Sequence, residues 1–145
     1  GQGVPQNADK AVEWFAKAAS AGNVNGQYNL GLAYVKGMGA PKDYAKASHY
    51  FRLAAEQNDA GAQYNLGVMY ANGEGVQKDP LQSYAWFDAA AKNEYQGAAA
   101  ARDEVAKQFS ADQMKQVKIV EADVLRNVKT PATSSAATNA TDQSL

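Results

Sequence analysis

Residues 63–76 read QYNLGVMYANGEGV, and residues 27–40 read QYNLGLAYVKGMGA. Gly-x-Gly elements begin at Gly1, Gly37 and Gly73, so their spacings are 37 − 1 = 36 and 73 − 37 = 36 residues. An internal period of about 20–50 residues is typical of solenoids and other repeat arrays, in which each unit buries its apolar face against its neighbours. The sequence therefore predicts a repeat protein rather than a domain with one central core.

Each unit contains an amphipathic helix with the same apolar pattern. Apolar residues recur at i, i+3, i+4, i+7 and i+8, a spacing that places them on one face of an α-helix. Each unit has two adjacent aromatic residues at the i+3 and i+4 positions of this pattern. Because these aromatic pairs keep the helical spacing, we interpret them as core between helices rather than as a ligand cage. The three sets align at intervals of 36 residues: Ala11, Trp14, Phe15, Ala18 and Ala19; Ala47, Tyr50, Phe51, Ala54 and Ala55; Ser83, Trp86, Phe87, Ala90 and Ala91.

Turn and capping residues separate the predicted helices. We interpret residues 1–6 as a loop and Asn7 as the N-cap of a helix that ends at Gly22, because glycine readily adopts the left-handed conformation that closes many helices. Asp43 and Asp79 are interpreted as N-caps of later helices, since a side-chain oxygen at this position accepts a hydrogen bond from a free backbone N–H.

The repeated Leu-Gly dipeptide lies in the second helix of each unit, which the pattern predicts over residues 24–36 in the first case. Leu30 and Tyr34 belong to the expected buried side of this helix. A glycine inside a helix costs roughly 1 kcal/mol relative to alanine. The presence of both Gly31 and Gly67 therefore predicts a site where two helices approach too closely for a Cβ atom.

The repeat pattern ends where Arg102 and Asp103 replace Leu-Gly. We therefore predict three regions: a repeat array over residues 1–109, with about three units of which the last is degenerate; a C-terminal capping helix over residues 110–127; and a disordered tail over residues 128–145. The tail consists mainly of Thr, Ser, Ala and Asn, which bury too little apolar surface to offset the entropy of ordering.

The predicted capping helix has its own start signal and a narrow apolar stripe. Ser110-x-x-Gln113 matches a capping box, in which each side chain bonds the backbone N–H of the other residue. Val117, Val120 and Val124 form the stripe, and Asp, Lys, Gln and Arg occupy the other face. One apolar face and one polar face are expected of the terminal helix of a solenoid.

Composition excludes several classes of function. The net charge is −1, with basic and acidic residues interspersed, so we expect no nucleic-acid partner. No apolar run approaches the roughly 20 residues that span a bilayer, so we expect no direct membrane insertion. The chain has no cysteine, which excludes disulfides, thiolate metal sites and cysteine nucleophiles. The absence of cysteine is compatible with the periplasm and with the cytosol.

The sequence contains no recognisable catalytic or metal-binding motif. His49 is the one histidine of the chain, so a site with several histidine ligands is excluded. Its repeat equivalents are Glu13 and Ala85, which predicts a variable and exposed face. The Gly-x-Gly elements lack the rest of a phosphate-binding pattern and are interpreted as turns. We therefore predict a protein that is not an enzyme and has no cofactor and no metal, and a hydrolase remains a remote alternative.

The sequence resembles the Sel-one-like repeat (SLR) family, relatives of the tetratricopeptide repeat. The resemblance implies an all-α fold, an α-solenoid of antiparallel helix pairs forming a right-handed superhelix, whose concave surface binds a partner protein or an extended peptide. It also implies an adaptor or scaffold, with a periplasmic or secreted bacterial protein favoured over a cytoplasmic one, and further repeats before this chain. The matching residues are Ala62-Gln63-Tyr64-Asn65-Leu66-Gly67, Tyr70, Gly73, Gly75-Val76, Asp79, Trp86 and Ala89-Ala90.

The resemblance also implies where a partner would bind. In tetratricopeptide repeats the helix with the Asn-Leu-Gly element lines the groove, and helical spacing places the corresponding positions here on one face. An Asn amide offers both a donor and an acceptor to a peptide, and Tyr adds a flat surface with a polar end. The predicted partner-binding residues are Asn25, Tyr28, Asn29, Leu32 and Lys36 in the first such helix, and Tyr64, Asn65, Val68 and Asn72 in the second.

Two alternatives remain open at this point. Asn29 and Asn65 would serve only to tie adjacent helices together, and Tyr28 and Tyr64 would only pack against the neighbouring repeat. In that case the array would be a structural spacer or a regulatory domain of a larger envelope, secretion or signalling protein.

Overall fold

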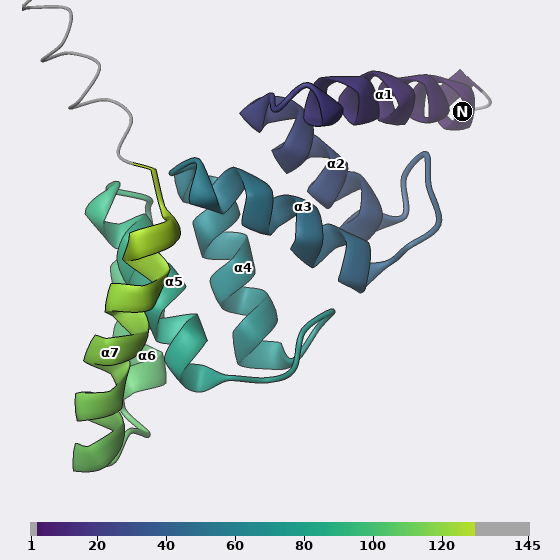
Figure 1. Cartoon of the computed structure of the whole chain (residues 1–145). Coiled ribbons are helices and arrows are strands. Elements are labelled where there is room, and N and C mark those ends of the chain that lie inside the picture. Colours follow the sequence, from purple (N-terminus) through teal and green to yellow (C-terminus); the bar gives the residue numbers. More distant parts are fainter. Residues whose placement is uncertain (1–2, 130–145) are drawn as a thin grey trace, which may run out of the picture.

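The computed structural model describes the backbone of residues 3–129 and the side chains from Asn7 onward. Within these residues the chain forms α-helices joined by short turns, without a β-strand. Figure 1 shows α1 to α6 following one another as an array of antiparallel helices. The helices are α1 (Gly3–Ser20), α2 (Val24–Lys36), α3 (Tyr44–Glu56), α4 (Ala60–Asn72), α5 (Pro80–Lys92), α6 (Ala98–Ala106) and α7 (Ala111–Asn127).

The predicted close approach of two helices occurs twice, one repeat apart. A Cβ atom added to Gly31 in α2 would lie 2.8 Å from the ring of Phe51 in α3. A Cβ atom added to Gly67 in α4 would lie 2.7 Å from the ring of Phe87 in α5. Both rings are almost fully buried. The glycines are therefore needed because an aromatic ring of the next helix fills the space that a side chain would take.

The helix ends follow the predicted capping signals for most of the chain. Asp43 and Asp79 are the N-caps of α3 and α5, and their carboxylates accept hydrogen bonds from backbone N–H groups of the first turn. Gly22 has a φ of +85°, in the left-handed region, as expected for the residue that ends α1. Ser110 and Gln113 form both hydrogen bonds of the predicted capping box at the start of α7.

The predicted start of the first helix is wrong. α1 begins at Gly3, so residues 3–6 belong to the helix and Asn7 lies inside it rather than at its N-cap. The physical reason is the position of Pro5, which falls in the first turn. Backbone N–H groups of that turn have no partner within the helix, so a proline there removes no hydrogen bond.

The core lies between successive helices. Phe51, Leu66 and Trp86 are at most 1% exposed, and small alanine residues of α3, α4 and α5 fill the space around them. Alanine-rich faces allow the helix axes to come close together, so the aromatic rings span from one helix to the next. Each unit is therefore stabilised by its neighbours, as a solenoid requires.

Trp14 is an exception to the predicted aromatic core, because its side chain is 70% exposed. Its repeat equivalents owe their burial to helices beside them. Tyr50 stacks on Tyr34 of α2, with ring centroids 6.0 Å apart, and Trp86 lies between α3 and α7. α1 is the first described helix, so Trp14 has no counterpart of Tyr34 to pack against.

α7 packs mainly along α5 (Figure 1). Val117 and Val124 are its buried apolar residues, as the stripe predicted, and Val120 packs against the core cluster. The backbone N–H of Lys129 donates to the carbonyl oxygen of Glu56 at the end of α3, at a distance of 2.7 Å. The predicted tail lies outside the described residues from 130 onward.

Arg102 and Asp88 form an ion pair at the position where the repeat pattern ends. The Arg102 guanidinium lies 2.8 Å from the Asp88 carboxylate, and the Lys92 ammonium lies 3.2 Å from its other oxygen. Asp88 is only 8% exposed. The residue one repeat before Arg102 is Leu66, which fills an apolar core. The sequence change from Leu to Arg therefore replaces an apolar contact between α5 and α6 with an ionic one.

Glu121 of α7 completes this charged cluster. Its carboxyl group hydrogen bonds with Asp88. Burial and this neighbouring carboxyl raise the pKa of Glu121 to about 7. Burial alone would raise the pKa of Asp88, but the hydrogen bonds from Glu121, Arg102 and Lys92 lower it below its ordinary value. Below about pH 7 Glu121 is therefore the protonated member of the pair, and Asp88 is the ionised one.

None of the helices in the described part of the chain is long and apolar enough to cross a membrane.

Candidate functional site

The predicted partner-binding residues lie on α2 and α4, the two helices that carry the Asn-Leu-Gly element. None of the nine is buried: each side chain is exposed or half-buried. Leu30 and Leu66, on the adjacent face of the same helices, are at most 1% exposed. The helices therefore separate a core face from a face that keeps contact with solvent, as the helical spacing indicated.

Tyr28 and Asn65 are brought together across two units. The ring of Tyr28 lies 5.8 Å from that of Phe51, and a Cβ atom added to Gly61 would lie 3.1 Å from it. Its hydroxyl oxygen accepts a hydrogen bond of 3.5 Å from the side-chain amide of Asn65. Burial raises the pKa of Tyr28, which the hydrogen bond with Asn65 partly opposes. This polar contact links α2 to α4 at the surface.

Tyr64 packs toward the following unit in the same way. Its ring stacks on Tyr95, with centroids 5.0 Å apart, and lies 5.3 Å from Phe87. The residue one repeat after Asn65 is Ala101, so the polar link between Tyr28 and Asn65 has no equivalent there. Both tyrosines therefore have a packing role, and each keeps part of its ring exposed.

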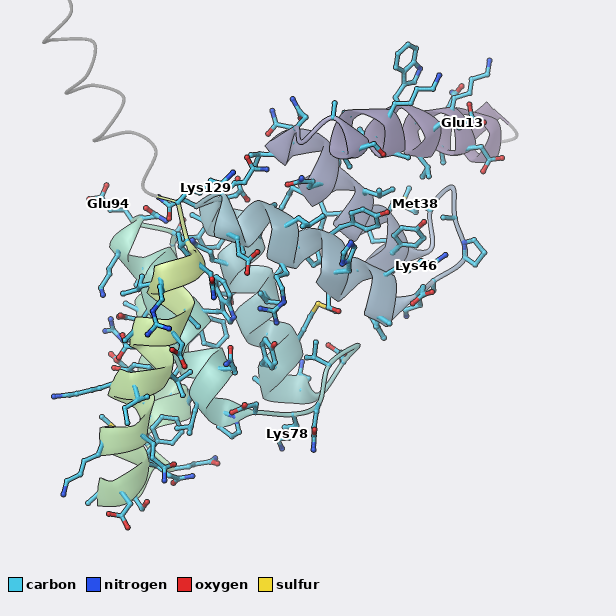
Figure 2. The ribbon with its side chains drawn as sticks, in the orientation of Figure 1. Glu13, Met38, Lys46, Lys78, Glu94 and Lys129 are labelled. Atoms are coloured by element: carbon cyan, nitrogen blue, oxygen red, sulfur yellow. The ribbon has the colours of Figure 1, made fainter. Side chains whose placement is uncertain are left out.

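Asn29, Leu32 and Lys36 form a second group on α2. Together with residues of α1 they line an open cavity of about 200 Å³. Met38, labelled in Figure 2, follows α2 in the chain and also lines this cavity; it is 50% exposed. This group faces α1, whereas Tyr28 faces α3 and α4, so the two parts of the predicted set on α2 contact different neighbours.

Asn25, Val68 and Asn72 belong to neither group. Asn25 is exposed in the first turn of α2, and Val68 is half-buried on α4. The side-chain amide of Asn72 donates to the Glu74 carboxylate at 3.3 Å. The structure thus gathers five of the nine residues into two local groups.

Sequence reasoning missed the wall that α1 contributes to the cavity. Ala8, Val12 and Phe15 lie on this wall; the apolar pattern places Phe15 in the core and gives no role to Ala8 or Val12. A signal was present in the repeat alignment: Ala8 and Ala33 stand where the next unit has Tyr44 and Met69. Loss of bulk at two facing positions predicts a gap between the helices.

His49 is exposed, as its variable repeat position predicted. Its equivalent in α5, Ala85, is not exposed. Ala85 is only 3% exposed because α7 covers this side of α5. Over residues 3–129 no group of three or more His, Asp or Glu side chains is placed to hold a metal ion.

Stacked antiparallel helix pairs with a partly polar, solvent-accessible face define a helical-repeat scaffold. The model of the Sel1 repeat matches residues 1–23, 24–59 and 60–95. The chain belongs to the Sel1 repeat family. In the matched register each complete unit is a pair of helices, α2 with α3 and α4 with α5, and α1 is the second helix of the unit before them. Sel1 repeats are generally protein-interaction modules.

Two solved structures share this fold. One is a protective antigen present in uropathogenic Escherichia coli strains that displays an SLR fold; it has a TM-score of 0.78 and 38% sequence identity over 83% of this chain. The other is a Sel1 repeat protein from Oxalobacter formigenes, with a TM-score of 0.68 and 33% identity over 80% of this chain. The chain spans 26% and 50% of the lengths of these two proteins.

No curated protein is similar enough in sequence to count as a match. The solved relatives support an all-α solenoid of antiparallel helix pairs in a right-handed superhelix, the fold class that the repeat period and the resemblance predicted.

Proposed function

We propose that the chain is a non-catalytic interaction module that binds a partner protein, as an extended peptide segment, through the face of α2 and α4. The observation that carries the proposal is that all nine of these positions are exposed or half-buried, beside a core in which Leu30 and Leu66 are at most 1% exposed. The general role of Sel1 repeats in protein interaction supports it.

The chemistry of this face suits a peptide backbone. An extended peptide presents alternating N–H and C=O groups, and a side-chain amide can pair with either of them. Asn25, Asn29 and Asn65 supply such amides. The amide oxygen of Asn65 is not used in its contact with Tyr28. The exposed parts of Tyr28 and Tyr64 supply flat apolar surface beside these amides. α7 packs along α5, at the end of the array. It therefore does not cover the side-chain amides of α2 and α4, which stay accessible to solvent.

The proposal is tested by selecting peptides that bind the chain from a displayed random library. The affinity of the best peptide is then measured by isothermal titration for the wild type and for the double variant Asn29→Ala/Asn65→Ala. We expect the double variant to bind at least about tenfold more weakly, since two hydrogen bonds of about 1 kcal/mol each are lost. Thermal unfolding of the variant verifies that the fold is intact.

A matched control is Gln116→Ala, which removes an exposed amide from α7. It should leave the affinity unchanged. If the control and the double variant weaken binding equally, or if neither does, the proposed face is wrong. If the library yields no binding peptide, the array acts as a structural spacer.

A further inference from the structure

The cavity between α1 and α2 has a largely apolar wall. Ala8, Ala11, Val12 and Phe15 line it from α1. Phe15 is half-buried; its repeat equivalents Phe51 and Phe87 are at most 3% exposed because each packs on a glycine of the helix that precedes its own, and α1 is the first helix described. The opposite wall belongs to α2 and the turn after it: Asn29, Leu32, Ala33, Lys36 and Met38.

The cavity results from two small residues that face each other. One repeat later, Met69 replaces Ala33 and is only 4% exposed, so a long side chain fills the equivalent space between α3 and α4. Tyr44 replaces Ala8 and packs against the core cluster. The space between α1 and α2 can therefore accept a side chain from another molecule, whereas Met69 fills the equivalent space between α3 and α4.

The size and charge of the cavity indicate what would occupy it. About 200 Å³ is below the roughly 300–1,000 Å³ of pockets that enclose drug-sized ligands, so one side chain is a better fit than a cofactor. Lys36 is the one charged residue among the nine that line it, and it is exposed at the surface. A carboxylate next to the inserted side chain would complement this charge.

We infer that the α1–α2 cavity is an anchor pocket for one aliphatic or aromatic side chain of an extended peptide, with an acidic residue of the same peptide paired with Lys36. This inference rests on the proposed function and specifies its ligand. Asn29 lies in both the proposed face and the pocket wall, so a peptide that follows the α2 face passes the pocket entrance.

The test is a titration of the chain with short blocked peptides, followed by amide chemical shifts in ¹H–¹⁵N spectra. The probe is N-acetyl-Ala-Leu-Ala-Asp-amide, and the comparison peptides carry Ser in place of Leu or Lys in place of Asp. We expect the probe to shift the amide signals of Leu32, Lys36 and Met38. Both comparison peptides should bind more weakly.

Two variants separate the apolar and the ionic part of the pocket. Ala33→Met introduces the side chain that the next unit has at this position, and it should weaken binding of the probe by roughly tenfold or more because the pocket is filled. Lys36→Gln should abolish the preference for Asp over Lys in the peptide while the preference for Leu over Ser remains. Ala99→Met, at an exposed site on α6, is the matched control and should change nothing.

The outcomes distinguish this inference from the proposed function. If peptides selected from the library lose affinity in the Asn29→Ala/Asn65→Ala variant but bind Ala33→Met and Lys36→Gln as tightly as the wild type, the face binds peptides and the pocket does not. If the Leu probe shifts signals of α5 or α7 instead, or binds no better than the Ser peptide, the anchor pocket is overturned.

Discussion

At the scale of single residues, two glycines of α4 lie against aromatic rings that differ in their freedom to move. Gly67 is fixed by the Phe87 ring, which a Cβ atom would meet at 2.7 Å. A Cβ atom added to Gly61, near the start of α4, would lie 3.1 Å from the ring of Tyr28. That ring is only half-buried and can move. The recurrence of glycine after leucine predicted the close approach at Gly67, whereas nothing in the sequence predicted the contact at Gly61.

These two glycines give a paired prediction. Gly67→Ala should lower the free energy of unfolding, because overpacking a filled core costs roughly 1–3 kcal/mol and outweighs a helix-propensity gain of up to roughly 1 kcal/mol. Gly61→Ala should leave the free energy of unfolding unchanged or slightly higher, because the Tyr28 ring can move aside and alanine favours the helix. Urea unfolding measures both. A Gly67→Ala protein at least as stable as Gly61→Ala would contradict the close approach.

The two tryptophans give a second paired prediction. Trp86→Ala should destabilise the protein by about 3–5 kcal/mol, as expected when a fully buried aromatic side chain is removed. Trp14→Ala should change the stability by at most about 0.5 kcal/mol because Trp14 is 70% exposed. Comparable losses in thermal or urea unfolding would show that Trp14 is buried in solution.

The sequence could predict that Trp14, Tyr50 and Trp86 share a helix face, because the spacing of apolar residues fixes the face. It could not predict their burial, which depends on a neighbouring helix. The same limit applies to Ala85, whose burial is caused by a helix outside the repeat pattern.

At the scale of elements, α7 is held by a carboxyl pair as well as by apolar contacts. The pKa of Glu121 is raised to about 7 from 4.5, so its contribution to stability is fully present below about pH 4.5 and is lost as the pH rises through 7. The pKa of Asp88 is lowered, so its contribution is present above its ordinary value and is lost as the pH falls toward the lowered one. Attachment of α7 should therefore be tightest near pH 4–5.

Glu121→Gln provides the test of this pH dependence. In the wild type, the free energy of unfolding should fall between pH 5 and pH 8, because ionised Glu121 is costly to bury and repels Asp88. In Glu121→Gln this part of the fall should disappear. Glu104→Gln removes an exposed carboxylate of α6 and should keep the wild-type profile. Identical profiles for the wild type and Glu121→Gln would show that the two carboxyl groups are apart in solution.

Removal of α7 gives the prediction for the element as a whole. A chain that ends at Phe109 would expose Ala85, Trp86 and Ala89, which are now at most 3% exposed. We expect the truncated chain to self-associate through this apolar face, as measured by sedimentation at increasing concentration. A truncated chain that stays monomeric would contradict the proposed role of α7 as a cap.

The sequence predicted the bounds of α2 and the capping box of α7 because both depend on local signals within a few residues. It placed the start of α1 too late, since a proline in the first turn is compatible with either a loop or a helix. The path of α7 along α5 could not be predicted either. It depends on contacts of Glu121 and Val124 with residues more than 30 positions away.

At the scale of the whole molecule, stability and binding both depend on the stacking of units. The 36-residue period and the resemblance to Sel-one-like repeats were sufficient to predict the solenoid, since the repeated stripe specifies each contact surface. Asn29 and Asn65, which the same repeat placed outside the core, are half-buried, and their role in binding stays a prediction. The pocket beside Asn29 was not predicted because it lies between two units, and its shape depends on Ala8 and Ala33 facing each other.

The most direct test of the account is to map where a library-selected peptide binds, by following amide chemical shifts of the whole chain during a titration. We expect the largest shifts in α2 and α4, including Asn29, Leu32 and Asn65, with small shifts along α5 and α7. Shifts concentrated on α5 and α7, with the amides of α2 and α4 unchanged, would contradict it.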